Sequence, residues 1–340
     1  MATPIMAANR LQQWITALLC AAQVPDEEAQ LIAAVRLEAA LRDPIGFDTF
    51  AARSLAHVLE RLQAGGLNPR PTIQLVHEAG PLALMDGDGG IGQLVGVRAM
   101  EHCLLLAAGH GVGLVGVRHS SSLGAMAHYA MMALARECIG FAATNTELRI
   151  GMPPWGGMTP TLGNNPFAVA IPVEEALPIV VDMSLTATEP QGEQPQMLAH
   201  RQALLGGGNV ARATMGGHKG YALAVALEVL CGVLTGAGFG LAHAHERIGA
   251  WTTPPDLGHL FVALDIKRLL PLPHFKMRMA TLIQQLKRSE LAPGTERIML
   301  PGELEFRRRE ARVQDGIPLT EQALTELQAM ANKLGLEFNR

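Results

Sequence analysis

Two glycine-rich segments contain residue types that bind phosphate. In the first, Gly87, Gly89 and Gly92 have the G-x-G-x-x-G spacing found where a dinucleotide binds at the start of a helix. That site also needs an acidic residue about 20 residues further on to hold the ribose. The next predicted strand ends instead in Arg118 and His119. We therefore interpret this segment as a tight strand-to-helix turn, although Arg118 leaves a site for a 2′-phosphate as the alternative.

The second segment, MGGHKGYALAV, combines a cation with a predicted helix start. Gly216 and Gly217 precede Lys219, and a long apolar run follows at once. Backbone amides at a helix start, together with a lysine, favour a phosphate group. Glycines before a buried helix are also common, so an ordinary helix start remains the alternative.

Composition excludes several classes of function. The 340 residues carry a net charge of −4 without a basic block, so we expect no nucleic-acid partner. The longest apolar helical run, residues 221–234, is interrupted by Glu228 and is too short to span a bilayer, so we expect no membrane partner. The four cysteines form no C-x-x-C pair, which predicts reduced thiols, a cytoplasmic location and no metal site. Residues 10–23 have helical apolar spacing and predict an ordinary first helix rather than a signal peptide.

The pattern of apolar residues predicts alternating helices and strands. We expect two helices within residues 8–42, with Pro25 in the first turn of the second, and a third helix within 54–66. A hairpin is predicted within 71–88, and helices are predicted from residue 92, within 124–137 and within 218–238. Further strands are predicted at 112–119, 138–146, 165–173, 177–184 and 259–266. This order indicates α/β layers around a mixed sheet.

Several segments together resemble the type 2 malate/L-lactate dehydrogenase family. They are GIGQLVGVRAME, IGFAATNT, MPPWGGMTPTLGNNPFAVAIP, VVDMS, GGHKGYALAV, PGELE and GIPLTEQALTEL, in the family's order. The resemblance implies a non-Rossmann, sulfolactate/malate dehydrogenase-like α/β fold, with a mixed sheet in α/β/α layers and a helical N-terminal region. It implies a substrate and dimerisation region, 1–118 with 280–340, a nicotinamide-binding region, 119–279, and a homodimer. It also argues against a coenzyme at the G-x-G-x-x-G segment.

The resemblance implies NADPH or NADH as coenzyme and assigns residues to it. Asp182 belongs to this set, with a capping or buried hydrogen-bonding carboxylate as the alternative. Asn145 and Asn165 are implied to line the substrate site, with loop asparagines bonded to backbone as the alternative. The full coenzyme set is Val181, Asp182, Met183, Ser184, Thr186, His218, Lys219, Pro301, Gly302 and Glu303.

This chain departs from the family at the positions expected to move a proton. Family members carry a D-S-H-G segment, over which Asp48, Thr49, Phe50 and Ala51 align, after an insertion at residues 43–45. Phe50 therefore stands where the proton-donating histidine is expected, beside Thr49 at the serine position. A second family histidine falls at Ser122, three residues after His119.

The family's substrate-side arginine and tyrosine also fall on other residue types. They align with Ser54 and Val58, but Arg53 and His57 are one residue away from them. Residues four apart share one helix face, so a one-residue slip would present Arg53 and His57 to the pocket. A solvated helix face is the alternative. The segment 189–214, which must act as a lid, is shorter than in relatives.

Two functions remain. The first is an NAD(P)H-dependent reductase of a small carboxylate, either a 2-keto acid or a cyclic 2-imino acid, with His119 or His57 as proton donor. An imine can be protonated before hydride arrives, so losing a donor matters less for it than for a ketone. The second is a catalytically silent homologue that keeps the fold and nucleotide binding in a regulatory or scaffold role.

Overall fold

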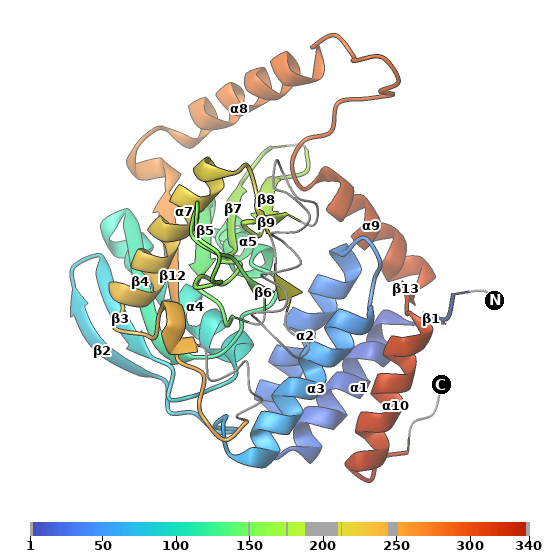
Figure 1. Cartoon of the computed structure of the whole chain (residues 1–340). Coiled ribbons are helices and arrows are strands. Elements are labelled where there is room, and N and C mark those ends of the chain that lie inside the picture. Colours follow the sequence, from blue (N-terminus) through green and yellow to red (C-terminus); the bar gives the residue numbers. More distant parts are fainter. Residues whose placement is uncertain are drawn as a thin grey trace.

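The computed structural model describes residues 3–148, 150–174, 176–187, 210–211, 213–243 and 251–337. Figure 1 shows a twisted sheet with a group of helices from both ends of the chain packed beside it. That group consists of α1 (Ala8–Ala21), α2 (Asp26–Arg42), α3 (Thr49–Ala64), α9 (Glu303–Asp315) and α10 (Glu321–Lys333). Leu11, Ile15, Leu18 and Leu19 of α1 are fully buried in it, as their helical spacing predicts.

Within the described residues, seven strands form one mixed sheet in the order β2-β3-β4-β12-β5-β7-β8. Only the β3–β4 pair is parallel, and the neighbouring pairs are antiparallel. The strands are β2 (Gln74–Ala79), β3 (Leu82–Asp86), β4 (Val112–Ser120), β5 (Cys138–Thr144), β7 (Phe167–Ile171), β8 (Ile179–Met183) and β12 (Leu257–Asp265). The predicted mixed sheet is therefore confirmed, and it contains strands from both predicted regions.

Alternating side chains of the sheet face two helical layers. Phe261 and Ala263 belong to the core under α4 (Gly92–His110) and α5 (Ala127–Met132). Leu260 and Val262, from the same strand, face α7 (His218–Glu228) on the other side. Since successive strand residues point to opposite faces, this division confirms the predicted α/β/α layers.

The remaining elements are short or peripheral. A 3₁₀ turn, η1 (Leu134–Arg136), follows α5, a π-helical turn, η2 (Val229–Val233), continues α7, and η4 (Ile266–Arg268) follows β12. Figure 1 shows α8 (Leu272–Lys287) along the outside of the molecule. In the part of the chain that the structure describes, three small two-stranded pairs join β1 (Ile5–Met6) to β13 (Ile317–Pro318), β6 (Ile150–Gly151) to β10 (Val210–Ala211) and β9 (Thr186–Ala187) to β11 (Ala213–Thr214).

The G-x-G-x-x-G segment is a tight turn whose amides are already occupied. The amide of Gly87 donates to the carbonyl of Arg118 at 2.9 Å, and that of Gly89 donates to the carbonyl of His119 at 2.9 Å. The amide of Gly92 donates to the Ser121 hydroxyl at 2.8 Å. A Cβ at Gly92 would lie 2.1 Å from the Ser121 carbonyl oxygen, so only glycine fits there. None of these three amides is left for a phosphate.

The described residues also bear on membrane spans, metal sites and disulfides. No described helix has both the length and the apolar character needed to cross a bilayer. Among the described residues, no cluster of three potential metal-ligating side chains is present. All four cysteines are free thiols.

Candidate active site

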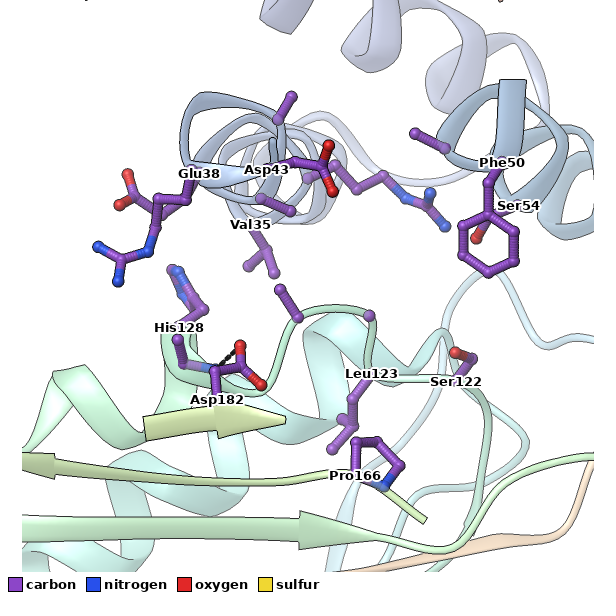
Figure 2. A pocket seen from close by; sticks show the side chains of 18 of the residues that line it. Val35, Glu38, Asp43, Phe50, Ser54, Ser122, Leu123, His128, Pro166 and Asp182 are labelled. Carbon is purple, nitrogen blue, oxygen red and sulfur yellow. Dashed lines mark hydrogen bonds between the residues drawn. The ribbon is translucent and has the colours of Figure 1, made fainter. Parts of the chain in front are cut away.

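One large cavity, of about 1370 Å³, lies between the N-terminal helices and one end of the sheet. Its walls come from α2, α3, the segment 121–128, the end of β8 and residues 299–302. Figure 2 shows Asp182 and His128 on one side of it, near Glu38, and Phe50, Ser54 and Ser122 on the other. The cavity thus joins the predicted coenzyme strand to the predicted catalytic helix.

The end of β8 presents Val181, Asp182 and Met183 to this cavity. The Asp182 carboxylate accepts a hydrogen bond from the Ala127 amide at 2.8 Å, and the side chain is open to the cavity. Protein atoms crowd the carboxylate, and the resulting desolvation raises its pKa. Asp182 therefore caps the start of α5, as the alternative reading of this residue foresaw, and still has oxygen lone pairs that face the cavity.

Pro301 and Gly302 continue the same wall at the start of α9. The carbonyl of Pro301 accepts from the Val180 amide at 3.0 Å. Gly302 has φ +86°, and a Cβ on it would lie 2.9 Å from the Cβ of Val180. A glycine is required here because the loop must press closely against β8 in a left-handed conformation.

Glu303 follows these two residues but is outside the cavity lining. Its carboxylate binds Lys287, accepts from Arg307 at 2.9 Å and accepts from the Leu300 amide at 3.1 Å. The hydrogen bond from Lys287 is the main reason why the pKa of Glu303 falls to about 2. The side chain is thus fully used in holding the 300–303 loop.

The face of α3 brings Thr49, Arg53 and His57 to the cavity. His57 stacks on Trp251 with 5.2 Å between ring centroids. Arg53 also reaches Glu326 at 3.5 Å, and 56% of its side chain is exposed. Both positions predicted from the one-residue slip therefore line the cavity, together with the aligned Ser54 and Val58.

The residues at the two histidine positions also line the cavity. Asp48 caps α3 by accepting from the Ala51 amide at 2.8 Å, which starts the helix earlier than the apolar pattern predicted. Phe50 follows this cap with 67% of its surface exposed, and Figure 2 shows Ser122 below it. Neither a phenyl ring nor a serine hydroxyl can serve as an imidazole-like acid near neutral pH. Thr49 donates instead to Gln322 at 3.4 Å.

His119 lies at the end of β4 and outside the cavity lining. Its backbone has φ +52°, its Nδ1 is 2.8 Å from Asp86, and its amide donates to Asp256 at 3.1 Å. The parallel pairing of β3 with β4 brings Asp86 next to this segment. These contacts hold the ring beside Asp86.

Asn145 and Asn165 are both buried and outside the lining. The amide of Asn145 donates to Gly238 at 2.8 Å and accepts from Gly258 at 2.9 Å. Asn165 donates to Glu228 at 2.6 Å. Both side chains hold backbone or α7 in place, in keeping with the structural alternative; their neighbours Thr144, Thr146, Asn164 and Pro166 line the cavity.

The remaining predicted coenzyme residues lie away from the cavity wall. Ser184 and Thr186 share a hydroxyl contact of 2.9 Å, and His218 and Lys219 are exposed at the start of α7. Most of the predicted lid, residues 189–209 and 212, lies outside the described residues.

Arg36, Arg42 and His128 are among the polar side chains on the cavity wall that were not predicted from the sequence. Arg42 is buried, stacks on Phe306 at 4.4 Å, and has one terminal nitrogen without a hydrogen-bond partner. Burial lowers the pKa of His128. For the two arginines, the available signal was a charged residue within the largely apolar pattern of residues 29–42.

These residues fit a nicotinamide dinucleotide. The cavity exceeds the roughly 300–1,000 Å³ of ordinary small-molecule pockets, which leaves room for a dinucleotide and a small acid. Buried nitrogen atoms of Arg36 and Arg42 lack partners and suit anionic groups. The open Asp182 carboxylate suits ribose hydroxyls.

Comparison with known proteins agrees with this geometry. The sequence model described as malate/L-lactate dehydrogenase matches residues 6–193 and 196–328. The chain is similar to a malate dehydrogenase of Pyrococcus abyssi, with 30% identity over 97% of this chain and 94% of that protein. It is 26% identical to a ureidoglycolate dehydrogenase (NAD(+)) of Escherichia coli K12, covering 91% of each.

A solved structure has the same fold. The sulfolactate dehydrogenase of Methanocaldococcus jannaschii superposes with a TM-score of 0.82 at 30% identity, over 98% of both chains. The family match spans nearly the whole chain. The chain therefore belongs to the malate/L-lactate dehydrogenase family.

Proposed function

We propose that this protein is an NAD(P)H-dependent oxidoreductase that reduces a small 2-imino or 2-keto acid, with cyclic 2-imino acids preferred. One observation carries the proposal: a single cavity is lined both by the β8 end with the 301–302 loop and by the face of α3. A coenzyme along β8 would place its reactive end toward α3, where an acid substrate would stand. NADH and NADPH are both compatible with these residues.

The chemistry requires a hydride, a held carboxylate and a proton. When bound, the reduced nicotinamide supplies the hydride to the carbon of the C=N or C=O bond. In this proposal Asp182 accepts hydrogen bonds from coenzyme hydroxyls, and the amine nitrogen or alkoxide oxygen takes up the proton. His57, which lines the cavity, is the donor that we propose for a ketone, and His119 is less suited because it is held by Asp86.

The preference for imines follows from Phe50 and Ser122. Loss of a positioned acid typically costs about 10²- to 10⁴-fold in rate for a substrate that needs it. A cyclic imine that is already protonated in water avoids most of this loss. The test is NADPH and NADH oxidation with pyrroline-2-carboxylate, pyruvate and diketogulonate. Faster turnover of the imine supports the proposal, and a clear preference for the keto acids contradicts it.

Phe50 and Ser122 also favour a second candidate, a nucleotide-binding homologue without turnover. The same panel, combined with fluorescence titration of NADH and NADPH, separates the two. Binding without oxidation of coenzyme by any substrate supports the silent homologue. Absence of coenzyme binding contradicts both candidates.

We further propose a homodimer with α8 at the contact. Met277, Leu282 and Leu286 of this helix are 60%, 45% and 43% exposed. Residues 282 and 286 are four apart and share one face of a helix that Figure 1 shows on the outside of the molecule. Leu282 and Leu286 belong to the region comprising 1–118 and 280–340, which would then supply most of the dimer contact and the substrate side, with 119–279 binding the coenzyme.

A further inference from the structure

Arg36, in the middle of α2, is a cation without a partner on the cavity wall. Its Nε is buried and has no hydrogen-bond partner, and the structure gives the guanidinium no acceptor among the described residues. Burial lowers the pKa of Arg36 to about 10, which leaves it protonated at neutral pH. A buried charge without a counter-ion destabilises the folded protein, so we expect an anionic ligand to bind Arg36.

Nearby carboxylates on the same helix are already occupied. Glu38 accepts from Nε of Arg309 with both oxygens, at 2.9 Å each. Asp43, at the end of α2, accepts from the amides of Ile45 and Gly46 at 2.7 and 3.2 Å. Neither carboxylate is paired with Arg36.

Helix geometry gives the direction in which Arg36 leaves α2. Figure 2 shows Val35 pointing toward the cavity floor, with Glu38 on the side of His128 and Asp182. At about 100° per residue, Glu38 lies about 60° to one side of Val35 and Arg36 about 100° to the other. Arg36 therefore projects away from the Asp182 side and toward α3.

A second observation gives the same placement. Tyr129 lies close enough to Arg36 to affect the pKa of the guanidinium. The Tyr129 hydroxyl donates to the carbonyl of Leu123 at 2.7 Å, and Leu123 adjoins Ser122. Figure 2 shows Leu123 and Ser122 on the same side of the cavity as Phe50 and Ser54.

This side of the cavity has no arginine at the position that the family resemblance assigns to the substrate acid. Ser54 occupies the position at which the family resemblance puts the substrate-side arginine, and a hydroxyl cannot pair with a carboxylate as an ion. Arg53 is 56% exposed and already reaches Glu326. Arg36 is more enclosed and has no partner, so it is better placed than Arg53 to bind an anion there.

We propose that Arg36 binds the substrate carboxylate, replacing from α2 the arginine that α3 lacks at position 54. This inference rests on the proposed function, since it assumes an acid substrate beside the coenzyme. The guanidinium can donate two parallel hydrogen bonds to a carboxylate, which fixes the orientation of the acid as well as its affinity. Arg42 shares the Glu38 side of α2 and is left for the coenzyme.

The test uses oxalate, a stable analogue of a 2-keto acid, and the full-length protein. Oxalate is titrated into the protein saturated with NADH, with nicotinamide fluorescence as the readout, in the wild type and in R36Q, R36K and R53Q. Arg98→Gln is the matched control, because Arg98 pairs with Glu101 on α4 and lies outside the cavity. NADH affinity and thermal stability are measured for each variant.

We expect R36Q to weaken oxalate binding by about 10- to 150-fold, which corresponds to the loss of one hydrogen bond to a charged group. R36K should give a smaller loss because lysine keeps the charge but cannot donate two parallel hydrogen bonds. R98Q should bind oxalate as the wild type does. NADH affinity should stay within about twofold. The melting temperature of R36Q without ligands should equal or exceed that of the wild type, because an unpaired buried charge has been removed.

Several results would overturn the inference. If R53Q rather than R36Q loses oxalate, Arg53 is the carboxylate ligand. If R36Q loses NADH instead, Arg36 binds the coenzyme phosphates. A lower melting temperature in both R36Q and R36K would indicate a purely structural role. Wild-type protein that binds NADH but not oxalate contradicts this inference alone, whereas failure to bind either NADH or NADPH contradicts the proposed function itself.

Discussion

Replacing Asp182 with asparagine separates its two roles. Asparagine has nearly the same shape and keeps an oxygen that can accept a hydrogen bond from the Ala127 amide. In the wild type this amide lies 2.8 Å from the carboxylate. It loses the negative charge that strengthens the hydrogen bonds accepted from coenzyme hydroxyls. If Asp182 only caps α5, D182N should bind coenzyme as the wild type does.

The expected loss follows from the kind of hydrogen bond removed. A hydrogen bond to a charged group contributes about 1.5–3 kcal/mol, and about 1.4 kcal/mol corresponds to a tenfold change in affinity. D182N should therefore weaken NADH or NADPH binding by about 10- to 150-fold. The assay is a fluorescence titration of the coenzyme at pH 7. Asp265→Asn is the control, since Asp265 also caps a backbone amide, that of Lys267 at 3.0 Å, but lies outside the cavity.

The raised pKa of Asp182 predicts two further signs. Because desolvation raises the pKa in the folded protein, Asp182 reduces stability progressively as pH rises from the unfolded to the folded pKa, and fully above it. D182N should therefore be at least as stable as the wild type at pH 7. Coenzyme affinity of the wild type should fall on acidification at a higher pH than for an ordinary aspartate. Equal coenzyme affinity in D182N and wild type would refute this reasoning.

Three other variants test the wall, the loop and the dimer. Gly302→Ala should lower the free energy of unfolding, measured in urea, by about 1–2 kcal/mol because alanine is strained in the left-handed backbone conformation. Coenzyme binding should also weaken because Val180 must move. Unchanged stability would contradict the close approach of Gly302 to Val180. E303Q should melt at a lower temperature than wild type at pH 7. The difference should shrink as pH falls from about 4.5 towards 2, because the ion pairs that lower the pKa of Glu303 stabilise only its ionised form. A pH-independent difference would argue against the ion pairs. The double variant L282E/L286E should elute as a monomer in size-exclusion chromatography with light scattering, whereas a monomeric wild type would argue against the α8 contact.

Much of the fold follows from local signals in the sequence. The strand predicted at 259–266 is present as β12, and glycines at positions 65 and 111 end α3 and α4 in the left-handed conformation. The Gly87–Gly92 turn was also predictable, because the residues that would complete a nucleotide site are missing. These features depend on neighbours close in the chain.

The site was harder to predict because it depends on contacts between distant segments. His119 is held by Asp86 through a strand pairing that spacing alone does not reveal. Asn165 bonds to α7, more than 50 residues later in the chain. Arg36 could be recognised as unusual, but its lack of a partner appears only once α2, α3 and the segment 121–128 are packed together.

The central claim is that a reduced nicotinamide coenzyme lies in the cavity between β8 and α3. A crystal structure with saturating NADPH or NADH tests it most directly. We expect density along Asp182 and Gly302, with the nicotinamide ring on the side of Phe50 and Ser122. Coenzyme bound elsewhere, for example at the Gly87–Gly92 turn, or a cavity that stays empty at saturation, would contradict it.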